Sequence, residues 1–186
     1  EFRLQPKLKE CVPASVFGAV VQASALALDF SLRHCFLVPY KRSRKGRNGW
    51  ESWHECQLII SFQGYIELAR RSGEINDIDA HVVYEGDEFD YQYGTTKFLK
   101  HRPTLGTRGK RLAAYAVANF KNGSSMFDVM PWLEVDKIKQ RSKSRDKDSG
   151  EITGPWATDE DEMARKTAVR RLAKYLPLSV ELRRAL

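Results

Sequence analysis

The spacing of apolar residues predicts a buried helix early in the chain. Pro13 can occupy the first position of a helix, where its missing N–H group leaves no hydrogen bond unmade. Residues that recur at helical spacing after it are Phe17, Val20, Val21, Ser24 and Leu28. We therefore predict a buried helix over residues 12–28.

Two apolar runs after that helix predict a β-hairpin. They cover residues 35–40 and 56–62 and are rich in strand-forming residues. The segment between them, residues 41–49, carries several like charges that repel one another, so we expect a mobile arm rather than a packed turn. Residues 64–72 then predict a short helix that ends at Gly73.

The rest of the chain is predicted to be β-rich and then helical. Strands are expected over residues 78–84, 89–93, 112–120 and 125–130, with Asn122-Gly123 as a hairpin turn. Helical spacing resumes from Pro131 to about Ser142, and residues 141–154 form a charged loop that we expect to be mobile. Thr158 and Asp161 resemble a capping box at the start of a helix that runs to Leu176, and residues 179–186 could begin another short helix.

Length and composition predict one soluble, intracellular domain over residues 1–186. The chain is 42% hydrophobic, which suffices for one core, and it contains neither a bilayer-length apolar run nor the apolar centre of a signal peptide. Because it begins without Met, we expect terminal segments of a longer protein to be absent. The cysteines Cys11, Cys35 and Cys56 lack metal-like spacing and are predicted to be packing residues in a reducing compartment.

A net charge of +7 favours a polyanionic partner. On the predicted C-terminal helix, Lys166, Arg170 and Lys174 follow one another at intervals of four residues, flanked by Arg171, and the apolar residues project to another side. The alternative is an ordinary solvated helix face. Since no acids alternate with these cations, we favour a stripe that binds phosphates.

Aromatic residues lie beside the basic segments and offer surfaces on which bases could stack. They are Tyr40, Trp50, Trp53, Phe62, Tyr65 and Trp156. Packing in the core is the alternative for Phe62 and Tyr65, and a helix-capping or staple role is the alternative for Trp156.

Enzyme chemistry finds little support in the residues. The acids Glu85, Asp87, Glu88 and Asp90 cluster around a predicted turn, and a solvated turn is favoured over a divalent-metal nuclease site. His34 with Cys35 and His54 with Cys56 lack the usual spacing of zinc ligands. No GxxxxGK[ST] motif is present, so we expect no ATP-driven strand exchange. Since neither the acids nor the His and Cys residues favour a metal site, we also expect no metal and no cofactor.

Long ordered stretches of the sequence carry a family resemblance. These stretches are Phe36–Tyr40, Gln57–Gly73, Val82–Phe89 and Gly154–Pro177. Through them the chain resembles, over nearly its whole length, the RecT family of phage and prophage single-strand annealing proteins. Two departures from the family pattern stand out: Gln63 occupies a position that is usually basic, and Ala27 and Phe30 occupy positions that often hold Gly and Pro.

The resemblance implies an activity, a fold and partners. It implies ATP-independent binding of single-stranded DNA and annealing to a complement in homologous recombination, by oligomers that form rings or helical filaments in the cytoplasm of a bacterial host. The implied α+β fold, shared in outline with lambda Red beta, has a curved antiparallel β-sheet with β-hairpins packed on a long helix and a basic groove between them. A RecE-like exonuclease and a host single-strand-binding protein are implied partners, and basic residues matching Lys166 and Arg171 are implied to hold the DNA backbone.

The predicted DNA-binding residues are basic, polar or aromatic, and none is predicted to be catalytic. They are Lys166, Arg170, Arg171, Lys174, Arg70, Arg71, Gln63, Tyr65, Lys41, Arg42, Trp156 and Thr153. Our hypothesis is that the cations hold one strand by its phosphates while its base edges stay available for pairing. Two alternatives remain open: a protein that passively coats single strands and, less favoured, a metal-dependent nuclease.

Overall fold

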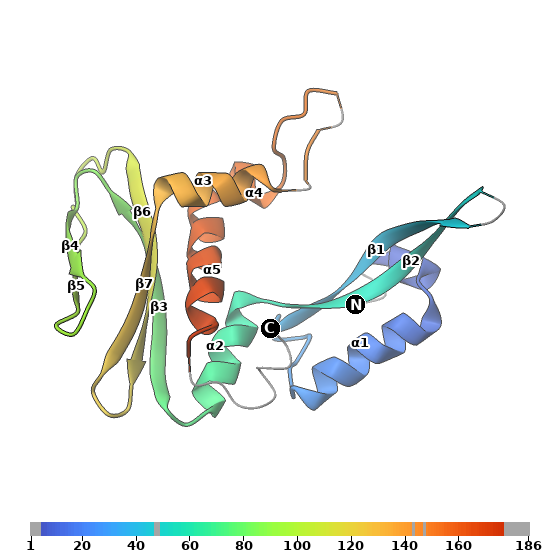
Figure 1. The fold of residues 1–186 in the computed structure, drawn as a ribbon, viewed down its shortest axis with the longest axis horizontal. Helices are drawn as coiled ribbons and strands as arrows, with labels where there is room; N and C mark the ends of the chain where they lie inside the picture. The colour runs from blue at the N-terminus through green and yellow to red at the C-terminus, as the bar shows by residue number, and fades with distance from the viewer. Residues whose placement is uncertain (1–4, 47–48, 143, 147, 177–186) are drawn as a thin grey trace. The chain divides into compact units, whose positions relative to one another are not determined.

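Two compact units make up the chain (Figure 1). The computed structural model describes residues 5–46, 49–142, 144–146 and 148–176, so the helix predicted over residues 179–186 lies outside the described residues. The first unit contains the described residues up to Ser72, and the second spans Gly73–Leu176. Both contain helices and antiparallel sheets, as an α+β chain should. The expectation of a single domain over residues 1–186 stays a prediction.

In the first unit, a helix packs on a long β-hairpin. A 3-10 turn over Pro6–Glu10 precedes α1 (Pro13–Ala25), which confirms the predicted helix. The prediction of its buried residues was partly wrong: Phe17 is 72% exposed and Val21 is also exposed. Ala19 and Ala23 are buried instead, and Ala19 packs against the hairpin residues Leu37 and Cys56. Small side chains on this face let the helix approach the hairpin closely.

α1 ends in a left-handed turn at a residue other than glycine. The Ala27 N–H donates to the Ser24 carbonyl (2.9 Å) and the Leu28 N–H to the Ala23 carbonyl (3.0 Å), which is a Schellman motif. Ala27 holds the positive φ of 47° that this motif requires and that glycine adopts more readily. Ala27, at a position that often holds glycine in the family, therefore adds strain to the backbone here.

The hairpin itself is longer than predicted. β1 (Cys35–Gly46) pairs antiparallel with β2 (Gly49–Ile60) from Cys35↔Ile60 to Gly46↔Gly49. The predicted mobile arm is wrong over residues 41–46, which continue β1; residues 47–48 lie outside the described residues. Acids on β2 offset the repulsion among the cations: Glu51 stands opposite Arg44 in the register, and Glu55 forms an ion pair with Arg42 diagonally across the hairpin.

α2 (Phe62–Arg71) follows β2 directly. The Ser61 hydroxyl accepts a hydrogen bond from the Gly64 N–H (3.0 Å), which caps the helix. A Cβ atom at Gly64 would lie 2.2 Å from the His34 carbonyl oxygen, so only glycine fits there. Gly73, with φ of 77°, follows the end of the helix as predicted. Local chemistry thus fixes both ends of α2.

The second unit is built on a three-stranded antiparallel sheet. Its strands are β3 (Ile75–Tyr84), β6 (Arg111–Phe120) and β7 (Ser125–Pro131), in the order β3-β6-β7, and Gly123 supplies the predicted turn between the last two. A separate hairpin pairs β4 (Glu88–Gln92) with β5 (Phe98–Arg102). We did not predict β5, because its two apolar residues are adjacent and three polar residues follow them, so the alternation typical of a strand is missing.

Different elements cover the two faces of that sheet (Figure 1). α5 (Glu160–Ala173) packs on one face, where Val82, Ala114 and Met130 meet Ala164. The β4–β5 hairpin covers the other face, where the Phe89 ring stacks on Tyr115. α3 (Trp132–Gln140) and the short α4 (Pro155–Thr158) complete the unit. The sheet therefore holds α5 through one buried face.

The start of α5 corrects the capping-box prediction. Asp159 is the N-cap and makes no side-chain capping bond, and Asp161 does not reach back to Thr158. Asp161 instead accepts hydrogen bonds from Tyr84 and from Arg111 (Nε–Oδ1 2.6 Å). The helix dipole favours the acids of the first turn, and two of them, Glu160 and Asp161, also form ion pairs with Arg111 on the sheet.

Two further expectations concern the cysteines and membrane-spanning helices. Cys11, Cys35 and Cys56 are all buried, which confirms them as packing residues. Within the described ranges, none of the helices has both the length and the apolar character needed to cross a bilayer.

Candidate nucleic-acid interface

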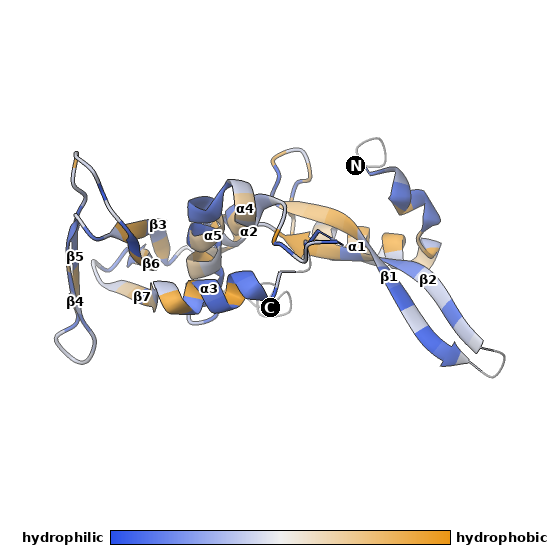
Figure 2. Ribbon diagram, turned by 90° about the horizontal axis from the view of Figure 1, so that it is seen from above, coloured by the Kyte–Doolittle hydropathy of each residue, from blue (hydrophilic) through white to orange (hydrophobic). Residues whose placement is uncertain are grey.

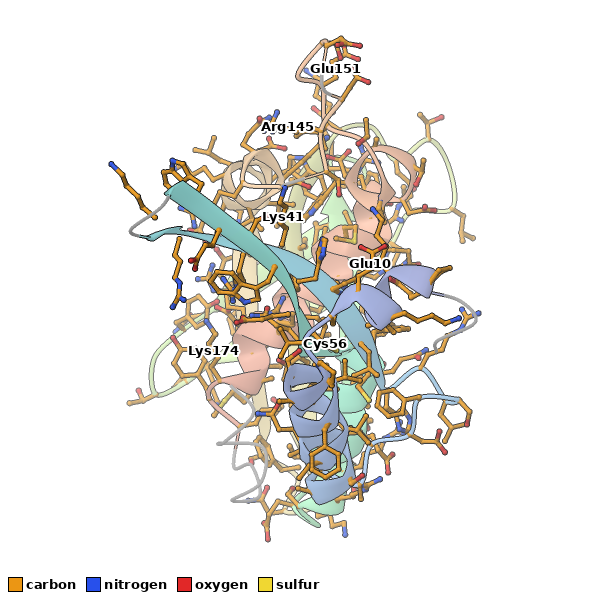
Figure 3. All side chains as sticks on the ribbon, turned by 90° about the vertical axis from the view of Figure 1, so that its right-hand side faces the viewer. Glu10, Lys41, Cys56, Arg145, Glu151 and Lys174 are labelled. Carbon is orange, nitrogen blue, oxygen red and sulfur yellow. The ribbon has the colours of Figure 1, made fainter. Side chains whose placement is uncertain are left out.

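α5 displays a basic stripe, which we define as Lys166, Arg170 and Lys174. Successive members are four residues apart and so lie on one side of the helix. Arg170 and Lys174 are exposed and Lys166 is half-buried; Figure 3 labels Lys174, at the end of the helix. In the described part of the chain, none of the three forms an ion pair. The stripe therefore keeps its charge available for an anionic partner.

Lys166 has the most unusual electrostatics of the stripe. Burial lowers the pKa of its ammonium group, and the nearby charge of Arg170 lowers the pKa further. Both effects disfavour the charged form in the free protein. An anion bound at the stripe would oppose both effects, so this lysine gains more from a phosphate than an exposed lysine would.

Arg171 differs from the stripe because it is already paired. Its Nε atom lies 2.7 Å from the Asp128 carboxylate on β7, and its Nη1 atom donates to the Glu134 carboxylate on α3. Burial raises the pKa of Asp128, and the Arg171 charge opposes that rise. Arg171 thus ties the C-terminal half of α5 to β7 and α3. Its predicted DNA contact stays a prediction, and any such contact would compete with these carboxylates.

The N-terminal end of α5 is tied down in the same manner. Arg111 on β6 pairs with Asp161 (2.6 Å) and Glu160 (3.2 Å), and Lys139 on α3 pairs with Glu160 (2.6 Å). Ion pairs near both ends therefore fix the helix on its sheet. The orientation of the basic stripe is set by these contacts and not by the cations of the stripe.

In the first unit, the distal part of the β1–β2 hairpin carries cations and tryptophans, and Figure 2 shows its hydrophilic colour. Arg42 pairs with Glu55 and Arg44 with Glu51, both at 3.1 Å. Lys41, labelled in Figure 3, is exposed and has no ion-pair partner among the residues that the structure describes. Trp50, near the distal end, is exposed and could offer a ring face to a base.

α2 holds the remaining predicted residues of the first unit. Gln63 and Arg70 are exposed, whereas Tyr65 is buried. Arg71 pairs with Glu67 (2.9 Å) and donates to the carbonyls of Leu26 (3.0 Å) and Ala27 (2.8 Å). Arg71 therefore stabilises the end of α1, a structural role that sequence spacing did not indicate.

Trp156 and Thr153 lie in very different surroundings. Trp156 is only 6% exposed and packs in the core formed by Val82, Met130 and Ala164. A base cannot reach its ring in this conformation, so packing accounts for this residue. Thr153 is exposed, and its N–H donates to the Ser144 carbonyl (2.8 Å) within the loop where Figure 3 labels Arg145 and Glu151.

The acidic cluster lies around a turn, as predicted, and Glu85, Glu88 and Asp90 are exposed, but the prediction was wrong for Asp87. The Asp87 carboxylate is fully buried and accepts hydrogen bonds from Arg108 (2.6 Å), His101 (3.1 Å) and the Thr104 N–H (2.9 Å). These donors hold the pKa of Asp87 far below its usual range, against the effect of burial. Glu88 pairs with Lys100 (2.5 Å). Over the described ranges, no group of three potential metal ligands comes together.

One basic region escaped the sequence reasoning. From Tyr91 to Phe127 the chain contains no Asp or Glu, although it contains Lys97, Arg102 and Lys110 among other cations. That absence of acids was the available signal. The structure sets part of this segment on an exposed loop between β5 and β6.

Comparison with known proteins places the chain in a family. The RecT family model matches residues 3–186. The chain is 40% identical to Protein RecT of Escherichia coli strain K12 over 189 residues, and 26% identical to the uncharacterized protein YqaK of Bacillus subtilis strain 168 over 190 residues. These alignments cover 100% and 99% of the chain but only 66% and 59% of the relatives. Because the family match extends over almost every residue, the chain belongs to the RecT family.

Proposed function

We propose that this chain binds single-stranded DNA and anneals it to a complementary strand in homologous recombination, without ATP and without covalent chemistry. Family membership supports this role. The observation that carries it is the basic stripe of α5, in which three cations on one helix side lack acidic partners among the described residues. A merely solvated helix face usually mixes charges of both signs.

The mechanism is retention of one strand by its phosphates. Lys166, Arg170 and Lys174 contact the sugar-phosphate backbone, and each contact releases a counterion. Lys41 and Arg70 supply exposed cations in the first unit. Because phosphate contacts carry no sequence information, the base edges stay free and the complementary strand reads the sequence. Base pairing supplies the free energy, so no nucleotide needs to be hydrolysed.

The finer features of the family resemblance belong to the same proposal. We propose a basic groove between a curved sheet and a helix, oligomers that form rings or helical filaments, and function beside a RecE-like exonuclease and a host single-strand-binding protein. The exposed positions of Gln63 and Thr153 are compatible with neutral hydrogen bonds to DNA. Three of the proposed DNA-binding arginines already form ion pairs with carboxylates: Arg42, Arg71 and Arg171. To contact DNA, each would have to share its side chain between the carboxylate and a phosphate or exchange one for the other.

An annealing assay with labelled strands tests this function. One of two complementary oligonucleotides, each carrying one dye of an energy-transfer pair, is coated with the protein before the second is added. Faster pairing than in buffer alone, without nucleotide, is the expected result. Slower pairing would indicate a passive coat. Shortening of end-labelled DNA in the presence of magnesium would indicate a nuclease, and either outcome would contradict the proposal.

A further inference from the structure

The loop between β5 and β6, residues 103–110, presents an apolar side chain to solvent. Leu105 has a relative exposure of 105%, the highest among the exposed large hydrophobic residues of the described chain. Single exposed leucines are common on proteins and need no explanation by themselves. Two further features distinguish Leu105: the way in which its loop is held and the charge that surrounds it.

Asp87 anchors both sides of this loop. Its buried carboxylate accepts hydrogen bonds from the Thr104 N–H (2.9 Å), directly before Leu105, and from the Arg108 guanidinium (2.6 Å), directly after the loop apex. The Arg108 guanidinium also lies 4.0 Å from the centre of the Tyr84 ring. A buried charge with several donors is costly to rearrange. Both ends of the loop are therefore held in place, and Leu105 lies exposed between them.

Backbone contacts complete this anchoring. The Gly86 N–H donates to the Arg108 carbonyl (2.9 Å), and the Glu85 N–H donates to the Lys110 carbonyl (2.8 Å). A Cβ atom at Gly86 would lie 3.0 Å from the Thr107 carbonyl oxygen, so glycine permits this close approach. An apolar tip held in place loses little conformational entropy on binding, which favours insertion into a partner.

The loop and its flanking strand ends carry several cations, although acids lie beside them: the Glu85 carboxylate lies against Gly109, and Glu88 stands opposite Arg102 in the pairing of β4 with β5. No Asp or Glu occurs between Tyr91 and Phe127. Arg108 is neutralised by Asp87, but Arg102 and Lys110 are exposed and, within the described ranges, form no ion pair. An apolar side chain between available cations matches a nucleic acid, whose stacked bases are flanked by phosphates.

We propose that this loop is a second nucleic-acid contact, in which Leu105 inserts between neighbouring bases of a bound single strand while Arg102 and Lys110 contact the phosphates on either side. The inference rests on the proposed function and adds a role for a region outside the basic stripe. Insertion of an apolar wedge unstacks one base step but leaves the pairing edges of both bases free. A strand held in this way stays open to its complement.

Fluorescence of 2-aminopurine in a bound oligonucleotide tests the wedge, because this base brightens when it is unstacked. The probes are dye-labelled oligothymidylate for affinity and an adenine-rich strand with 2-aminopurine for unstacking. Leu105→Ser is compared with the matched control Leu133→Ser, which changes a leucine that is 67% exposed on α3. Both variants should fold, since neither side chain is buried.

We expect L105S to lose at least half of the 2-aminopurine increase and to bind oligothymidylate about fivefold more weakly, because a partly buried leucine contact is lost. L133S should match the parent protein, and R102Q/K110Q should weaken binding with a smaller salt dependence. If the 2-aminopurine signal of L105S equals that of the parent protein, the proposed insertion of Leu105 between bases is overturned. A change in the self-association of DNA-free L105S would not rescue it. Failure of the parent protein to bind either strand would instead overturn the proposed function.

Discussion

Neutralising the basic stripe of α5 should reduce the salt dependence of DNA binding by a predictable amount. The variant K166Q/R170Q/K174Q keeps polar side chains on the helix but removes three charges that have no ion-pair partner among the described residues. Each phosphate contact to a single strand contributes about 0.7 to the slope of log affinity against log salt. Three contacts give a slope difference of about 2. Between 50 and 200 mM salt, the parent should therefore lose about twentyfold more affinity than the variant.

Fluorescence anisotropy with a labelled oligothymidylate, measured across a salt series, gives both slopes. The control K7Q/K121Q/K137Q removes the same net charge from exposed lysines outside the stripe. Urea unfolding of each variant checks that the fold is intact. Equal slopes for the stripe variant and the control would refute the reasoning, because the charge of the stripe would then act only through the net charge of the protein.

Three further predictions concern single residues. In K166R, the affinity for DNA should fall less steeply as pH rises above neutrality, because a guanidinium stays charged, whereas burial lowers the pKa of Lys166 and so favours its neutral form. The measurement is DNA affinity against pH for the parent and the variant. Curves that coincide would contradict this prediction. R171Q should lower the free energy of unfolding by about 1–2 kcal/mol, whereas R170Q should change it by less than about 0.5 kcal/mol in urea unfolding. A27G should raise it by about 0.5–1 kcal/mol by relieving the left-handed conformation, and a decrease would argue against strain.

Sequence reasoning located the basic stripe correctly but not the state of its neighbours. The helix and the four-residue spacing of Lys166, Arg170 and Lys174 follow from periodicity alone. The pairing of Arg171 with Asp128 and Glu134 depends on residues far away in sequence that β7 and α3 bring to the helix. No local pattern distinguishes a paired arginine from an available one, because both lie on the polar side of the same helix.

Local sequence patterns also did not predict which side chains are buried. Trp156 stands next to a helix start, where sequence allowed either base stacking or packing, and the core around it decides for packing. Asp87 lies in a run of acids that suggests a solvated turn. Its burial depends on Arg108 and His101, which the chain returns to it from the next hairpin and loop. Only a closed fold brings such donors together, and only then is a buried carboxylate tolerated.

The sequence by itself determined the family, the order of most helices and strands, the hairpin turn at Asn122-Gly123 and the end of α2 before Gly73, because turn chemistry, helix termination and side-chain periodicity are properties of neighbouring residues. Tertiary structure alone decided which face of α1 is buried, that β1 continues through its cations, and which cations remain available. These outcomes depend on cross-strand register and on contacts between residues tens of positions apart, such as Arg111 with Asp161, and such contacts exist only after the sheets and helices have packed.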